Sequence, residues 1–171
     1  MQSYHLVQQG PAFPEDIDFG LVRSTKAYRL TTKKHSDGRE EVDSGTFDLP
    51  PDVYNGGMAL IIAKNLPAGG RATVHVVALT PKPRMIQLEL SPAGEQKVLL
   101  GKRAETAMHW VFHPNLGALL GLFAKLLGKT PPDNHAWIAT DEAPGFVRFE
   151  GPLYLKGPIW RIDLSTPAWP H

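Results

Sequence analysis

The residues best suited to metal or acid–base chemistry are His109 and His113, in an extended run that stops at Pro114. Side chains four apart in a strand share a face but lie about 13 Å apart, at roughly 3.3 Å per residue. One metal ion holds its ligands at about 2 Å, so a regular strand cannot offer both histidines to it. A bend at Pro114 that brings in His135 or Asp133 is the alternative. We expect no metal and no cofactor, and two exposed or hydrogen-bonded histidines.

Other polar motifs are weak candidates for catalysis. Asp141 and Glu142 are adjacent, and adjacent residues of a strand point apart, which suits paired acid–base catalysis poorly. Ser44-Gly45 lacks the first glycine of a nucleophile turn, and phosphate-binding, dinucleotide-binding and His-Glu-x-x-His motifs are absent. The basic turn at residues 33–39 is typical of a solvated hairpin tip. Because the chain also has no cysteine, we assign no catalytic residue and lean against an enzyme.

The charge of the chain is nearly balanced, with 18 Lys and Arg against 17 Asp and Glu, so we expect no nucleic-acid partner. Residues 56–130 nevertheless carry a local excess of positive charge. Their charged residues are Lys64, Arg71, Lys82, Arg84, Lys97, Lys102, Arg103, Lys125 and Lys129, against Glu89, Glu95 and Glu105. A solvated strand face explains the excess most simply, and a surface for an anionic lipid or phosphate is the alternative.

The second half of the chain is rich in aromatic residues, which can fill a core or line a pocket. Trp and Phe side chains inside a curved sheet can bind an apolar molecule, and the same side chains can pack around a helix. Both interpretations stay open. The candidate ligand-binding residues are Met108, Trp110, Phe112, Leu119, Leu120, Phe123, Trp137 and Trp160.

The longest apolar segment, residues 116–127, predicts the helix around which the other elements pack. Its only charged residue is Lys125, and apolar side chains recur on all sides at helical spacing, so most of its circumference must be covered. Asn115 can cap its start and Gly128 can end it. At about a dozen residues it is too short to span a bilayer, which takes roughly 20.

The run before this helix predicts a strand with one large apolar face. Met108, Trp110 and Phe112 alternate with His109 and His113, so the two sets lie on opposite faces. The apolar face is suited to receive the helix that follows it.

The remaining elements are short and are separated by Gly and Pro turns. Extended runs occur at residues 4–9, 17–22, 27–33, 40–47, 71–79, 84–90, 96–100, 134–140, 145–150 and 159–164. Asp37-Gly38 predicts a tight hairpin turn, and Pro92-Ala93-Gly94 predicts a turn between two strands. Residues 56–66 predict a second short helix, with Asp52 or Asn55 as its cap. Such short connections favour an up-and-down antiparallel meander.

Together these elements predict one mainly β domain, of the α+β class, over residues 1–171. We expect an antiparallel, strongly curved sheet or open barrel of about eight to ten strands, given the short connections. The apolar helix at residues 116–127 lies in the concave side, and the helix at residues 56–66 covers one end.

Several turn and packing motifs resemble those of an uncharacterised bacterial family, a domain of unknown function, and the resemblance covers most of the chain. The motifs are Leu49-Pro50-Pro51-Asp52, Asn55-Gly56, Lys64-Asn65-Leu66-Pro67, Thr80-Pro81-Lys82-Pro83, Gly128-Lys129 with Pro131-Pro132-Asp133, Trp137-Ile138, Glu150-Gly151-Pro152-Leu153-Tyr154 and Gly157-Pro158-Ile159-Trp160-Arg161. Such proteins are similar in organisation to the bacterial lipoprotein-carrier fold, in which a curved antiparallel sheet wraps around helices.

The resemblance implies lipid or apolar-ligand handling by analogy of fold, and a periplasmic or cell-envelope location for a full-length product. It also implies further strands before Tyr4, so that the chain is an N-terminally shortened form. A missing strand exposes a sheet edge, through which a homo-oligomer can form. The first residues have neither the basic nor the apolar region of a secretory signal. The resemblance supplies no catalytic residue.

The leading functional hypothesis is therefore non-enzymatic binding of a lipid or other apolar molecule in the concave face of a curved sheet. The alternative is a structural or interaction module that docks through a free β edge or through the basic surface of residues 56–130. An enzyme that uses His109, His113 and His135 is the third hypothesis.

Overall fold

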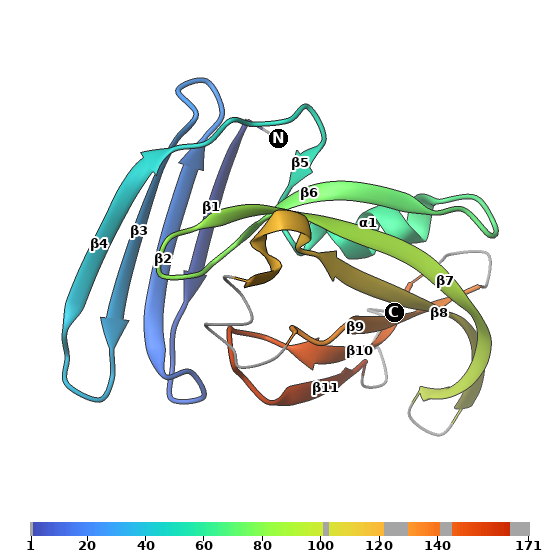
Figure 1. Cartoon of the computed structure of the whole chain (residues 1–171). Helices are drawn as coiled ribbons and strands as arrows, with labels where there is room; N and C mark the ends of the chain where they lie inside the picture. The colour runs from blue at the N-terminus through green and yellow to red at the C-terminus, as the bar shows by residue number, and fades with distance from the viewer. Residues whose placement is uncertain (1, 101–102, 122–129, 141–144, 165–171) are drawn as a thin grey trace, which may run out of the picture. The chain divides into compact units, whose positions relative to one another are not determined.

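Figure 1 shows the computed structural model of the protein, which describes residues 2–100, 103–121, 130–140 and 145–164. Within these residues the elements are eleven strands in two sheets, one complete α-helix and one 3-10 turn. The prediction of a mainly β fold with a curved antiparallel sheet is confirmed. These eleven strands exceed the predicted eight to ten, because a two-residue strand is included.

The chain divides into two compact units. The first consists of Met1–Asn55 and His75–Met85, and the second of Gly56–Val74 and Ile86–His171. We describe each unit by itself and refer to them as the first and the second unit.

The first unit contains a four-stranded antiparallel meander. Its strands, in their order in the sheet, are β1 (Ser3–Gln8), β2 (Glu15–Val22), β3 (Ala27–Lys34) and β4 (Glu40–Thr46). The hairpin predicted at Asp37-Gly38 joins β3 to β4. Gly38 has a φ of 68°, and its N–H donates to the Lys34 carbonyl at 2.9 Å. This left-handed conformation is the one that glycine adopts without steric cost.

One face of this sheet forms an aromatic core. Ile17, Phe19 and Leu21 alternate along β2 and are buried, as the two-residue period of a strand requires. The ring of Tyr28 stacks on Phe47, with centroids 4.6 Å apart, and lies 6.2 Å from the ring of Phe19. The alternation in the sequence thus accounts directly for the core of the first unit.

The edge strand β4 turns a carboxylate towards this core. The Tyr28 hydroxyl donates to Asp43 Oδ2 at 2.8 Å, and burial together with Asp43 raises the pKa of Tyr28. Gly45 leaves room for the ring, because a Cβ there would lie 3.1 Å from the Tyr28 oxygen. An inward-pointing charge on an edge strand disfavours pairing with another chain.

The second sheet has seven strands in the order β11-β10-β9-β8-β7-β6-β5. Their bounds are β5 (Val53–Tyr54), β6 (Ala72–Ala78), β7 (Arg84–Leu100), β8 (Arg103–Asn115), β9 (Asn134–Ala139), β10 (Phe146–Pro152) and β11 (Ile159–Asp163). Strands β6 to β11 are neighbours in chain order, so the predicted up-and-down meander is confirmed. The exception is β5, which pairs parallel with β6.

The predicted turn at Pro92-Ala93-Gly94 is wrong. These residues form a bulge inside one 17-residue strand, β7, where the register shifts between Pro92 and Gly94. Gly94 has a φ of 103°. Proline lacks an N–H for the ladder and glycine accepts a positive φ, so both residues suit a bulge as well as a turn. A bulge bends its strand, and β7 is strongly curved in Figure 1.

The short helix predicted at residues 56–66 is confirmed as α1 (Met58–Asn65), which buries Ala59 and Ala63. Its predicted cap is wrong, because the N-cap residue is Gly57 and no side chain caps the helix. The carboxylate of Asp52 instead accepts a hydrogen bond from His75 Nδ1 at 3.0 Å. The β5–β6 pairing explains this, since it places His75 directly opposite the residue that follows Asp52.

The helix predicted at residues 116–127 lies largely outside the described residues, which stop at 121 in this region. The part that is described begins with the 3-10 turn η1 (Gly117–Leu119), where Asn115 Oδ1 accepts a hydrogen bond from Gly117 N–H at 3.1 Å. Leu116 is buried, whereas Leu120 is 49% exposed. Across the described ranges, no helix has the length and apolar character needed to cross a membrane.

Candidate functional site

Strand pairing in the second unit aligns a row of polar and aromatic side chains across four strands. His109 lies opposite Trp137, Trp137 opposite Arg148, and Arg148 opposite Asp163. Directly opposed residues of an antiparallel pair project from the same face. We call this side of β7 to β11 the site face.

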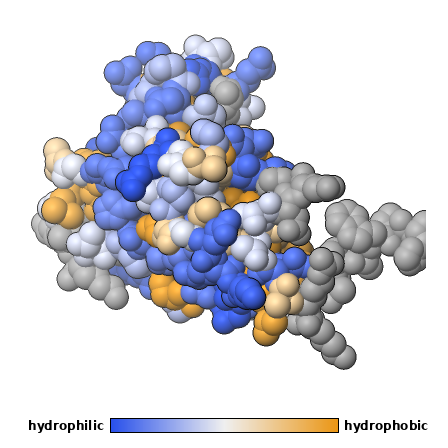
Figure 2. All heavy atoms as spheres, turned by 90° about the vertical axis from the view of Figure 1, so that its right-hand side faces the viewer, coloured by the Kyte–Doolittle hydropathy of each residue, from blue (hydrophilic) through white to orange (hydrophobic). Residues whose placement is uncertain are grey.

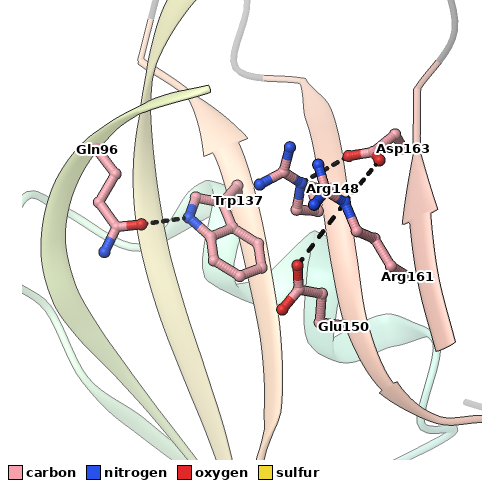
Figure 3. Close-up of polar contacts among 6 residues, drawn as sticks. All are labelled: Gln96, Trp137, Arg148, Glu150, Arg161 and Asp163. Atoms are coloured by element: carbon pink, nitrogen blue, oxygen red, sulfur yellow. Dashed lines mark hydrogen bonds and ion pairs between the residues drawn. The ribbon is translucent and has the colours of Figure 1, made fainter. Parts of the chain in front are cut away.

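Trp137 is the centre of the site face. Its ring is buried and stacks on the His109 ring, with centroids 4.5 Å apart and an interplanar angle of 5°. The guanidinium carbon of Arg148 lies 5.4 Å from the ring centroid, a cation–π distance. The indole Nε1–H donates to Gln96 Oε1 at 2.8 Å, as Figure 3 shows. Three strands therefore hold one indole in a single orientation.

This arrangement also fixes the protonation of a histidine. Gln96 Oε1 accepts the hydrogen bond from Trp137, so the amide nitrogen of Gln96 faces His109 Nδ1 at 3.3 Å. An amide nitrogen only donates, so His109 Nδ1 must be the acceptor. The proton of neutral His109 then lies on Nε2, which donates to His135 Nδ1 at 3.0 Å. The network accommodates His109 only in its neutral form.

The electrostatics also favour the neutral form of His109. Burial and the neighbouring His135 lower the pKa of His109, and Glu150 opposes them only in part. The unfolded chain therefore binds more protons than the native protein between the lowered pKa and about 6.5, and native stability falls as the pH drops through this interval.

We expect the His109→Gln variant to lose this pH dependence. Wild-type protein becomes easier to unfold with urea between pH 7.5 and 5.5, and the variant shows a smaller decrease over the same interval. The exposed His5, which pairs with Asp18 in the first unit, provides a matched control, because His5→Gln should retain the decrease caused by His109. If the free energy of unfolding falls equally with pH in wild type and His109→Gln, the lowered pKa of His109 is not the cause of the decrease.

Ion pairs continue the site face towards β11. Asp163 accepts from Arg148 Nε at 2.6 Å and from Arg161 Nε at 2.8 Å, and Arg161 lies 3.9 Å from Glu150. The hydrogen bond from Arg148 is the main cause that lowers the pKa of Asp163 below its usual range. The pairs made by the half-exposed Arg161 contribute little stability, so their main effect is to orient its guanidinium group (Figure 3).

An open depression of about 570 Å³ lies between β7 and β11. Its lining comprises Lys97, Val98, Leu99, Arg148, Arg161, Asp163 and Leu164. β11 is the last strand of its sheet, and the seven-residue β6 is too short to pair with the whole of the 17-residue β7. The depression therefore lies where the end of β7 at residues 97–99 approaches the free edge of β11.

The structure separates the predicted ligand-binding residues. Met108, Trp110, Phe112 and Trp160 project from the face opposite to Trp137, because Trp110 lies opposite Ala136 and Trp160 opposite Gly151. Trp110 and Phe112 are buried there. Leu119 ends η1 and Leu120 follows it. Phe123 lies outside the described residues.

The predicted histidines form two separate pairs. His109 contacts His135, and His113 Nδ1 donates to Asp133 at 2.7 Å. Within the ranges that the structure describes, no group of three or more His, Cys, Asp or Glu is arranged to hold a metal ion.

Four important residues of the site face were absent from the predicted set: Gln96, Arg148, Arg161 and Asp163. Alternation within residues 145–150 and 159–164 could have placed the two arginines on the same side as Glu150 and Asp163. Only the register between strands shows that they adjoin Trp137.

Fold and site together define a mainly β protein in which a curved antiparallel sheet presents an aromatic and charged face. Comparison with known protein families, curated proteins and solved structures finds no match.

Proposed function

We propose that the protein binds a lipid or another apolar ligand, without chemical conversion, in the depression between β7 and β11. The observation that carries this proposal is the combination of a 570 Å³ depression with large apolar side chains exposed at its rim. Leu99 is 63% exposed and Leu164 37%, whereas the neighbouring lining residue Val98 is buried. Ligand sites commonly have volumes of about 300–1,000 Å³.

A bound alkyl chain would remove these side chains from water. Each Å² of apolar surface that is covered contributes about 25 cal/mol, so two half-exposed leucines favour an apolar ligand measurably. Figure 2 shows separate hydrophobic patches between hydrophilic residues on the side where β7 curves. The resemblance of the turn motifs to proteins organised like lipoprotein carriers supports the same class of ligand, by analogy of fold.

Native mass spectrometry of the purified protein, followed by organic extraction, tests for a bound apolar molecule. Titration with dodecanol then measures binding to the emptied protein. We expect Leu99→Ser and Leu164→Ser each to weaken dodecanol binding about five- to tenfold, since each removes part of the covered apolar surface.

The control variant is Val42→Ser, which changes a strand residue that is 50% exposed on β4 of the first unit. It should bind dodecanol like wild type. Failure of wild type to bind dodecanol or any extracted apolar molecule contradicts the proposal, as does equal binding by all three variants.

Docking through a β edge or through the basic surface of residues 56–130 stays a prediction. The inward-pointing Asp43 disfavours pairing at the β4 edge only.

A further inference from the structure

We infer that the depression selects amphipathic ligands with an anionic group, a carboxylate or a phosphate, which Arg161 and Lys97 hold beside the apolar rim. This inference rests on the proposed binding function and specifies its ligand class. The observation behind it is the charge of the lining, whose residues include three cations (Lys97, Arg148 and Arg161) and one carboxylate (Asp163). Glu150 lies beside this lining, 3.9 Å from Arg161.

Arg148 and Asp163 form the fixed part of the site. Arg148 has a side chain only 15% exposed, donates to Asp163 through Nε, and lies over the Trp137 ring. Asp163 in turn accepts from both arginines, one at each carboxylate oxygen. This double contact holds the Arg161 guanidinium at the depression, so Asp163 is a positioning residue for Arg161.

Arg161 retains donors for a ligand. Its side chain is 55% exposed, and its contacts to Asp163 and Glu150 both use Nε. A guanidinium has five N–H donors in a planar fork, which suits two oxygens of a carboxylate or phosphate. The terminal nitrogens make no further ion pair among the residues that the structure describes, and they can therefore meet an anion.

Lys97 supplies the second cation from the opposite side of the depression. Within the described part of the chain it has no ion-pair partner, and it flanks the buried Val98 on β7. An anion between Lys97 and Arg161 would lie next to Leu99 and Leu164. Charge and apolar surface thus occur together, as in a molecule with an acidic head and an alkyl chain.

The test compares three ligands with the same alkyl chain: dodecanoate, dodecyl phosphate and dodecanol, with inorganic phosphate as a fourth probe. At pH 7.5 and low salt we expect wild type to bind at least one of the two anions about tenfold more tightly than dodecanol, as charge-assisted hydrogen bonds provide. Added salt should reduce this preference. The carboxylate and phosphate titrations show which head group is preferred.

Arg161→Gln and Lys97→Gln should each weaken binding of the preferred anion about five- to tenfold and should weaken dodecanol binding much less, because dodecanol carries no charge. Arg39→Gln is the matched control for Arg161, because Arg39 is also an exposed arginine whose Nε pairs with a carboxylate, that of Glu41. Lys33→Gln, on exposed β3 surface of the first unit, is the control for Lys97. Far-ultraviolet circular dichroism confirms that each variant is folded.

The outcomes separate this inference from the proposed function. Equal affinity of wild type for dodecanol and both anions overturns the inference and leaves apolar binding intact. Failure of all three amphiphiles to bind overturns both. Binding of inorganic phosphate as tight as that of dodecyl phosphate also overturns the inference, because the alkyl chain would then contribute nothing.

Discussion

Replacing Trp137 with alanine is expected to lower the free energy of unfolding by about 3–5 kcal/mol, the range for truncating a buried Trp or Phe. The indole is buried in one cluster with Val98 and Val147, and it stacks on His109. Alanine leaves a cavity at the centre of the site face and removes the donor that orients Gln96. Urea unfolding followed by circular dichroism measures the loss. A change below about 1 kcal/mol would mean that the site face packs differently.

The variant Trp137→Phe separates packing from hydrogen bonding. Phenylalanine fills much of the same space but has no N–H, so we expect a loss of about 1 kcal/mol for the bond to Gln96. Trp160→Phe is the matched control, since Trp160 Nε1 is buried without a hydrogen-bond partner among the described residues. Its loss should be smaller. With the donor gone, Gln96 can turn, and Trp137→Phe should also weaken the pH dependence that we assign to His109.

The parts of the fold that could be predicted are those determined by neighbouring residues. Asp37-Gly38 specifies its own turn, and the apolar spacing in α1 specifies a helix without knowledge of the rest of the chain. The bulge in β7 could not be distinguished from a turn at Pro92 and Gly94, because both structures use the same local preferences. A bulge forms instead of a turn when the partner strand continues past these residues. Strand β8 does so, because it pairs with β7 on both sides of the bulge.

The candidate site was much less predictable, because it depends on register between strands. Alternation placed His109 and Trp110 on opposite faces of one strand, and the structure agrees. Nothing local, however, indicates that Trp137 lies opposite His109 rather than opposite Trp110. A shift of one residue in the β8–β9 pairing would exchange the faces. Charged residues such as Arg148 join the site only through this long-range pairing.

Replacing Gly151 with alanine is expected to destabilise the second unit by about 1–3 kcal/mol, the usual cost of overpacking a filled site. Gly151 is buried on β10, and a Cβ there would overlap Asn134 Oδ1 and lie 3.0 Å from the ring of Phe149. The overlap is not compatible with van der Waals contact, so the Asn134 side chain must move. Thermal and urea unfolding measure the effect.

The matched control is Gly20→Ala on β2, where a Cβ meets nothing within 4 Å and φ is not positive. This substitution should be neutral or stabilise by up to about 1 kcal/mol, because alanine restricts the unfolded chain. An equal loss at Gly20 and Gly151 would show that the cost comes from the strand backbone and not from the contact.

A double-mutant cycle identifies the contact itself. Asn134→Ala removes the atoms closest to the new Cβ, and Asn134 Oδ1 is a buried acceptor without a partner in the described part of the protein. Losing it should therefore cost little. In that background Gly151→Ala should lose most of its effect, with a coupling of about 1 kcal/mol or more, within the range found for residues in contact. Additive losses would mean that Asn134 is not what excludes a side chain from position 151, and the close approach of β9 to β10 would then need another cause.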